Sequence, residues 1–214
     1  MTIVTASPRR RRRHPDELRA EAIAAARKIL VEDGPAAITL QAVAAALGMT
    51  HGSITHHFGT AANLQAAVAD DVIGQLLEDV RRGVRALRAG DIDEAGLVDL
   101  VFDTFAQTGV GRLIGWLAAT DRQMLEPLFS RFSRLPSELA GDTTGGSTVA
   151  DHELPALVKG IVSGALSASL IGDELDHALG LPRSFAKRRA ARELTLRRGA
   201  SIVSCEFRRP GSQS

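Results

Sequence analysis

The chain has 214 residues, a formal net charge of +1 and a single cysteine, Cys205. Aromatic residues make up only 4 % of the chain and tyrosine is absent, which argues against a sheet protein because strands favour aromatic and β-branched side chains. The lone cysteine excludes an internal disulfide framework and fits a reducing compartment. We therefore expect a cytoplasmic protein of all-α fold.

The sequence predicts neither a secretory signal nor a membrane-spanning segment. Arg9–Arg13 lead into His14 and Pro15 rather than into an apolar run, so we expect no secretory signal. The longest uncharged apolar stretch of the C-terminal half covers residues 160–172, and a bilayer span needs roughly 20 residues. We therefore expect no membrane partner.

The charges are distributed unevenly along the chain. Residues 1–60 carry eight Lys and Arg against five Asp and Glu, or +3. Residues 61–182 carry nine against eighteen, or −9, and residues 183–214 carry nine against two, or +7. The chain is thus polarised, with basic ends and an acidic middle.

The N-terminal part begins with a basic arm and a first helix. We predict that residues 1–14 form a flexible basic arm. A helix is predicted to begin at Pro15, because proline suits the first helical position and Asp16 and Glu17 complement the helix dipole. Apolar side chains then recur at helical spacing until Gly34 and Pro35 end the helix.

Two short helices are predicted next. Thr39 is placed to cap the first, Gly48 ends it, and Thr50 is placed to cap the second. Two short helices separated by a turn that contains glycine have the helix-turn-helix layout. We therefore predict a three-helix helix-turn-helix domain over residues 15–60.

The rest of the chain is also predicted to be helical. A long helix is expected over residues 61–87, and further helices at about residues 92–108, 112–120, 123–139, 153–171 and 183–203. Residues 141–148, with the sequence GDTTGGST, are predicted to form a loop. Residues 61–214 are therefore expected to form a second, larger helical domain.

The segment around the predicted helix-turn-helix carries several motifs in register. Gly34 is followed 14 residues later by Gly48, with Val43-Ala44 between them, and then by the block THGSITHHF (residues 50–58) and Leu64. Over residues 18–68 this pattern resembles the N-terminal DNA-binding domain of TetR-type transcriptional regulators, whose block usually runs Ser-Lys-Gly-Thr-Leu-Tyr-x-His/Tyr-Phe. The remainder of such proteins is an all-helical domain for ligand binding and dimerisation, which agrees with the helical pattern of residues 61–214.

Three positions depart from the family pattern. His51 stands for the usual Lys, Thr55 for the usual Tyr, and Ala61-Ala62 lack the Lys that usually follows the Phe. The family's Tyr and Lys are usual phosphate ligands. We therefore expect the arginines of the basic arm to supply phosphate or minor-groove contacts in their place.

The candidate DNA contacts follow from the same layout. In a helix-turn-helix, the second of the two short helices enters the major groove and presents its solvent face to base edges. Helix starts also leave backbone N–H groups free to bind a phosphate. The candidates are Arg9, Arg10, Arg11, Arg12, Arg13, Thr39, Gln41, Thr50, His51, Gly52, Ser53, Thr55, His56, His57 and Thr60.

The resemblance implies a small-molecule cavity among the central helices. Ligand pockets are mostly apolar with a few orienting polar groups, so we expect a neutral or weakly polar, hydrophobic effector. The candidate ligand contacts are Phe102, Phe105, Trp116, Thr120, Gln123 and Met124, with Phe129 and Phe132 as further aromatic residues. Each of these aromatics also suits ordinary core packing.

The resemblance further implies a homodimer formed by the last two long helices. The helix predicted over residues 153–171 is apolar on more than one side and carries small residues, so a second helix could approach it closely. The candidate interface residues are Leu157, Ile161, Gly164 and Ala168. We expect a homodimeric repressor that binds a near-palindromic double-stranded operator and is released by a small hydrophobic ligand.

Two other functions remain open at this point. One is a DNA-binding regulator without a small-molecule effector. The other is a small helical enzyme, for which Asp151-His152-Glu153 and Asp173-Glu174 would be the acid–base groups. No nucleophile motif, phosphate loop or metal-ligand spacing accompanies them, so we expect no enzyme and no cofactor. His56 and His57 point about 100° apart on a helix and suggest no metal site.

The basic C-terminal segment allows two interpretations. It contains Arg183, Lys187, Arg188, Arg189, Arg192, Arg197, Arg198, Arg208 and Arg209. The first interpretation is a solvated helix face directed towards the acidic middle of its own or a partner subunit. The second is a further contact with nucleic acid or with acidic lipid.

Overall fold

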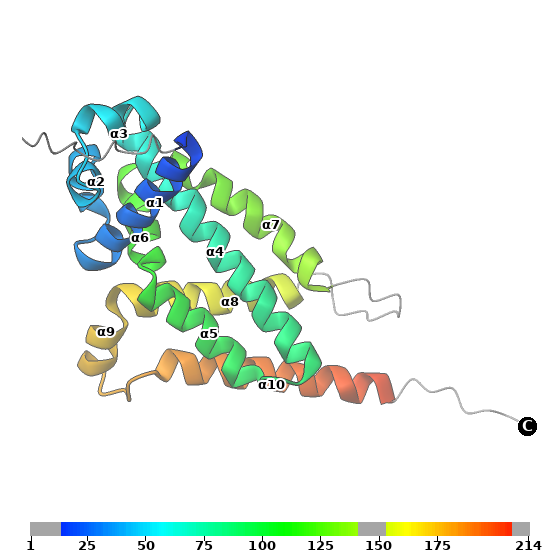
Figure 1. Ribbon diagram of the computed structural model, residues 1–214. Helices are drawn as coiled ribbons and strands as arrows, with labels where there is room; N and C mark the ends of the chain where they lie inside the picture. The colour runs from blue at the N-terminus through cyan, green and yellow to red at the C-terminus, as the bar shows by residue number, and fades with distance from the viewer. Residues whose placement is uncertain (1–13, 141–152, 207–214) are drawn as a thin grey trace, which may run out of the picture.

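The computed structural model describes residues 14–140 and 153–206, and these residues form helices joined by short turns, without a strand (Figure 1). The predicted all-α fold is therefore confirmed. The arm residues Arg9–Arg13 and the loop predicted over residues 141–148 lie outside the described residues.

The N-terminal unit consists of three helices and one 3₁₀ turn. They are α1 (Pro15–Glu32), the 3₁₀ turn η1 (Pro35–Ala37), α2 (Leu40–Ala46) and α3 (His51–Phe58). The helix start predicted at Pro15 is confirmed, with His14 as the N-cap residue. The backbone N–H of His14 donates to a carboxylate oxygen of Glu17 at 3.3 Å, which closes a capping box.

Threonine caps begin three successive helices. The hydroxyl oxygens of Thr39, Thr50 and Thr60 each accept a hydrogen bond from the backbone N–H three residues later, at 3.0, 3.3 and 3.1 Å. Gly48 lies in the turn between α2 and α3 with φ +61°, a conformation that favours glycine. The caps predicted at Thr39 and Thr50 are confirmed, and the cap at Thr60 starts the following long helix.

The larger part of the chain forms a bundle around that long helix. Its elements are α4 (Ala61–Ala89), α5 (Glu94–Gln107), α6 (Val110–Thr120), η2 (Arg122–Leu125), α7 (Glu126–Ala140), α8 (Glu153–Ser167), η3 (Ala168–Gly172), α9 (Asp173–Ala178) and α10 (Phe185–Glu206). Helix α4 runs away from the N-terminal unit, while α8 and α10 pass crosswise at the far end of the bundle (Figure 1).

Most predicted helices of the larger part differ from the observed ones in their boundaries, and the differences after residue 120 have identifiable causes. The helix expected over residues 123–139 is preceded by the 3₁₀ turn η2, and the one expected over 153–171 ends at Ser167, where the π turn η3 begins. The short helix α9 was not predicted. The last helix begins at Phe185 rather than at residue 183, because the N–H of Phe185 bonds to the carbonyl of Pro182 and Ser184 has φ +65°.

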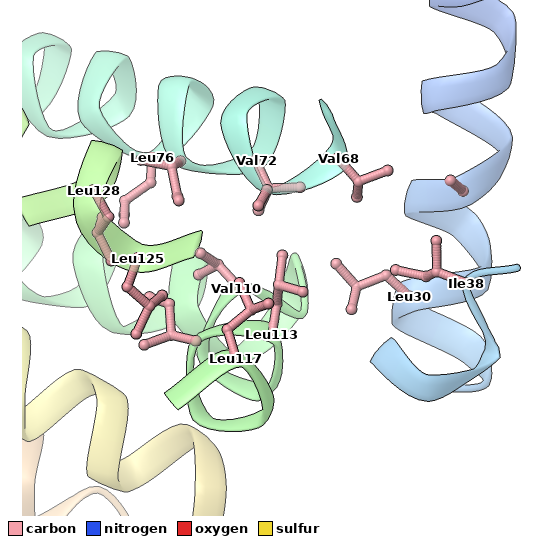
Figure 2. Close-up of a cluster of buried hydrophobic side chains, with 14 of the residues drawn as sticks. Leu30, Ile38, Val68, Val72, Leu76, Val110, Leu113, Leu117, Leu125 and Leu128 are labelled. Carbon is pink, nitrogen blue, oxygen red and sulfur yellow. The ribbon is translucent and has the colours of Figure 1, made fainter. Parts of the chain in front are cut away.

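One apolar core passes from the N-terminal unit into the larger bundle. Leu30 of α1 and Ile38 next to η1 lie beside Val68 of α4, and the row continues through Val110 to Leu128 (Figure 2). All five side chains are buried. The two predicted domains therefore share a packed core, and a shift of α4 or α6 changes the surroundings of α1 directly.

The described chain contains one stretch that is long and apolar enough to cross a membrane, Pro155–Ala178, with a mean hydropathy of 1.4. The sequence analysis considered only the uncharged residues 160–172 and expected them to be too short for a membrane span. The longer stretch, which includes charged residues, corrects that expectation. Only 6 % of the 18-residue apolar segment within this stretch is buried. A single such stretch is weak evidence for a membrane span. The lysine and three acidic residues within it oppose burial in lipid.

Candidate nucleic-acid interface and apolar cavity

Helix α3 is held in place by one buried face. Ile54 and Phe58 are buried one turn apart, and the guanidinium of Arg19 lies 4.9 Å from the centre of the Phe58 ring, a cation–π contact. The opposite face of α3 is consequently turned to solvent, as a helix that enters a DNA groove requires.

The predicted DNA contacts from Thr39 to Thr60 lie on α2, on α3 or at their ends. The exposed ones are Thr39, Gln41, Thr50, His51, Gly52, His56 and Thr60, and the half-buried ones are Ser53, Thr55 and His57. The structure therefore brings these candidates together on the helix-turn-helix.

Local hydrogen bonds engage the hydroxyl groups of α3. The Thr55 hydroxyl donates to the backbone carbonyl of His51 at 2.9 Å, and the hydroxyls of Thr50 and Ser53 lie 3.0 Å apart. The His51 and His56 side chains extend into solvent beside them. Among the described residues, no group of three His, Cys, Asp or Glu side chains is placed to hold a metal ion.

Gly52 lies in the first turn of α3 and is exposed. A Cβ atom built on it would meet no heavy atom within 4 Å, and its φ is not positive. Neither packing nor backbone conformation therefore requires glycine at this position. Because glycine has no side chain, the helix backbone can approach another molecule closely at this position.

Several polar contacts connect the N-terminal unit to the bundle. Arg27 of α1 forms an ion pair with Asp71 of α4 at 3.2 Å, and the amide of Gln65 donates to the carbonyl of Ile38 at 3.1 Å. Arg112 of α6 donates to the carbonyl of Leu30 at 2.9 Å. These contacts attach α1 and η1 to both α4 and α6.

An apolar pocket of about 170 Å³ lies between the helices of the bundle and is partly open to solvent. We call it the bundle cavity. Helices α4, α5, α7, α8 and α10 all contribute to its walls. The lining residues are Leu76, Val80, Val84, Leu87, Leu97, Val98, Val101, Phe105, Phe132, Leu135, Leu157, Val158, Ile161, Val162 and Leu194. Every one of these side chains is aliphatic or phenyl.

The predicted ligand contacts are divided between this cavity and other places. Phe105 and Phe132 line the cavity. Phe102 is buried against Gly164, and Trp116 packs against the core without lining the cavity. The Thr120 hydroxyl bonds to the carbonyl of Trp116 at 2.8 Å. Gln123 and Met124 instead border a separate groove between α4 and α7.

The predicted dimer contacts lie on α8 and at the first residue of η3. Leu157 and Ile161 line the cavity. A Cβ atom on Gly164 would lie 3.3 Å from the ring of Phe102, and Ala168 packs against the core. These four half-buried residues therefore contact other helices of the same chain. Their role in a dimer stays a prediction.

A different group of apolar side chains is exposed at the same end of the molecule. Its members have exposed fractions between 38 % and 74 % and lie on η3, α9 and α10 or in the turn between them: Leu170, Ile171, Leu175, Leu179, Phe185 and Leu196. We call this group the distal apolar face. Such a concentration of exposed apolar side chains marks an interaction surface.

Sequence reasoning missed most of the cavity wall. Val80, Val84 and Leu87 of α4 and Leu194 of α10 line it, although no polar or aromatic neighbour distinguishes them in the sequence. The only available signal was the apolar stripe of the long helix, which predicts burial without indicating an open space.

Lys187 joins the basic C-terminal segment to the acidic middle. Its ammonium lies 2.5 Å from a carboxylate oxygen of Asp103 and 3.3 Å from one of Asp99, both on α5. Partial burial works to lower the pKa of Lys187, but the hydrogen bonds and charges of the two carboxylates outweigh it and raise that pKa. This contact agrees with the first interpretation of the basic segment, while Arg188, Arg189 and Arg192 are exposed.

On α4, a hydrogen bond from Arg85 lowers the pKa of the exposed Glu78 carboxyl. The other charges nearby, Arg81 and Arg82, act in the same direction. The ionised carboxylate lies on the helix surface and does not line the cavity.

Comparisons with known proteins decide the family. Residues 22–68 match the family model of the bacterial regulatory proteins of the tetR family. Residues 22–68 form a TetR-family DNA-binding domain. The matched segment runs from the middle of α1 into α4 and contains the whole helix-turn-helix. The chain therefore carries the DNA-binding unit of a family of transcriptional regulators.

Solved structures support the TetR-family fold over most of the chain. A multidrug binding protein, EbrR, solved in complex with imidazole, is 24 % identical, with a TM-score of 0.60 over 90 % of this chain and 96 % of that one. A TetR-family transcriptional regulator from Pectobacterium atrosepticum is 18 % identical, with a TM-score of 0.56 over 87 % and 95 %. No curated protein sequence matches this chain.

Proposed function

We propose that this TetR-family protein is a homodimeric repressor that binds a near-palindromic DNA operator and leaves it when a small molecule occupies the bundle cavity. The observation that carries the proposal is the course of α4. This single helix begins at the Thr60 cap directly after α3 and reaches the cavity wall at Leu76, Val80, Val84 and Leu87.

A ligand in the cavity would act on the DNA-binding unit through this helix. It shifts the equilibrium only by the difference between its affinities for the DNA-binding and the released conformations. Because α4 packs against α1 and is tied to it by Arg27 and Asp71, a changed position of α4 changes the position of α3 as well.

The distal apolar face supports the homodimer. A second copy of the chain would cover its exposed leucines, Ile171 and Phe185, and a usual interface buries about 800 Å² per partner. A two-fold axis at this end of the molecule would present two copies of α3 to DNA, about 34 Å apart on successive turns of the major groove. The operator would then be an inverted repeat.

Selection of bound sequences from random double-stranded DNA with the full chain tests this function. We expect two inverted half-sites with centres about 34 Å, or one helical turn, apart, and a complex that contains two protein chains. Recovery of a single half-site by a monomer would contradict the dimeric operator complex. Failure to enrich any sequence would contradict operator binding itself.

A further inference from the structure

The bundle cavity offers no hydrogen-bonding side chain to a ligand. Its walls are built from leucine, valine, isoleucine and two phenylalanines. An ionised group moved from water into such surroundings loses its hydration without gaining a partner, which is strongly unfavourable. The wall chemistry therefore excludes a ligand that must bury a charge.

The described core around the cavity contains no polar side chain that is free to hydrogen-bond to a ligand. Among the described residues, Thr104 of α5 is the one buried polar side chain, and its hydroxyl donates to the carbonyl of Leu100 at 2.8 Å. No buried side-chain nitrogen or oxygen in the described part of the chain lacks a hydrogen-bond partner. The described core around the cavity therefore supplies no unpaired polar side chain to a ligand.

The carboxylates on the neighbouring helices are also engaged elsewhere. Asp99 and Asp103 of α5 bind Lys187, and Glu78 of α4 binds Arg85. None of these carboxylates lines the cavity. A cationic ligand would consequently find no counter-charge on the walls.

The volume indicates the size of the part of a ligand that the cavity encloses. An apolar cavity of about 150 Å³ remains dry and binds benzene, whereas pockets for drug-sized molecules occupy about 300–1,000 Å³. The cavity here has about 170 Å³. Phe105 and Phe132 add two phenyl rings to its wall, and phenyl groups favour edge-to-face or offset contacts with another aromatic ring.

We propose that the bundle cavity binds an uncharged, apolar molecule about the size of one substituted benzene ring and discriminates against charged molecules of the same shape. The link from binding to release of DNA rests on the proposed function. The binding preference itself rests on the cavity alone.

Three probes of nearly equal shape test the preference: toluene, benzoate and benzylammonium. Binding to the DNA-free protein is measured by saturation-transfer NMR and by the shift of the thermal unfolding midpoint. We expect toluene to bind and raise the midpoint, and the two ions to bind at least roughly 100-fold more weakly. Equal binding of toluene and either ion would overturn the proposal.

Cavity variants show whether toluene occupies this site. Val98→Thr keeps the side-chain shape but adds a hydroxyl to the wall, and Val162→Phe fills space. Each is expected to weaken toluene binding by about tenfold or more. Val31→Thr, on an exposed side chain of α1, is the matched control and should leave binding unchanged. If Val162→Phe does not fold, Val98→Thr decides; unchanged toluene affinity in the folded cavity variants overturns the proposal.

The operator complex separates the ligand preference from the proposed function. If toluene binds the cavity but the operator complex stays intact, the proposed ligand class is supported and the proposed role of the ligand in releasing DNA is contradicted. A charged molecule that binds the cavity and releases the operator, while toluene does not bind, overturns the ligand class and leaves the regulatory function standing.

Discussion

The guanidinium of Arg112 donates a hydrogen bond to the backbone carbonyl of Leu30 at 2.9 Å, across 82 residues of sequence. The same group also bonds to the carbonyl of Val31. These carbonyls belong to the last turn of α1, where helix carbonyls lack partners within the helix and favour a cation. Arg112 thus attaches the start of α6 to the end of α1.

Substitution Arg112→Met should therefore loosen the N-terminal unit. We expect the free energy of unfolding to fall by about 1–3 kcal/mol, because the variant loses a charged donor to two carbonyls. Urea unfolding measures this loss, and hydrogen exchange should report faster opening in the last turn of α1. Arg122→Met, on an exposed side chain of η2, is the control and should stay within about 0.5 kcal/mol of the parent. Equal stability of the two variants would contradict the role of Arg112.

Substitution Gly52→Ala separates DNA contact from folding. Since a Cβ atom meets nothing within 4 Å at this position, alanine should preserve stability or raise it by about 0.5–1 kcal/mol. If the α3 backbone approaches DNA closely, the added methyl group should lower operator affinity about tenfold or more, as measured by fluorescence anisotropy on the selected operator. Gly74→Ala on α4, with only ordinary contacts, should leave affinity unchanged. Full affinity of Gly52→Ala would show that this backbone does not contact DNA.

Substitution Ile171→Asp tests the distal apolar face. At a two-fold interface the change places a carboxylate on each side of the contact, and burial of unpaired charge should weaken the dimer by roughly 100-fold or more. Analytical ultracentrifugation should then find monomers where the parent forms dimers. Phe129→Asp alters a similarly exposed apolar side chain on α7 and should remain dimeric. The reverse result would place the interface on α7.

Substitution Lys187→Met tests the link between α10 and α5. Loss of the pair with Asp99 and Asp103 should lower the unfolding free energy by about 1 kcal/mol at neutral pH. Because folding raises the pKa of Lys187 above its ordinary 10.5, the stabilisation is fully present below that value and disappears as the pH rises through the higher folded-state value.

Unfolding in urea from pH 7 to 11.5 measures this dependence. The difference between parent and Lys187→Met should be constant up to about pH 10 and then shrink. The control is Lys28→Met, which alters an exposed i,i+4 pair with Glu32 at 3.8 Å and should cost no more than about 0.5 kcal/mol. A difference that grows with alkaline pH would contradict the assignment.

The helix-turn-helix was predictable because short-range interactions specify it. Thr39 and Thr50 cap the helices that follow them through bonds to the third residue onward, and Gly48 supplies the turn between. Each of these contacts joins residues within one helical turn. The sequence alone therefore determined where α2 and α3 begin and end and which residues they present to solvent.

The cavity and the distal apolar face depended on packing between helices. Leu157 and Ile161, which the sequence suggested as dimer contacts, line the cavity, whereas Ile171 and Leu175 are exposed. Periodicity predicts that α8 is apolar on two sides, but it does not state which side meets α5. That choice, and the open space left between valines and leucines of five helices, follows from how distant segments fit together, and only the tertiary structure decided it.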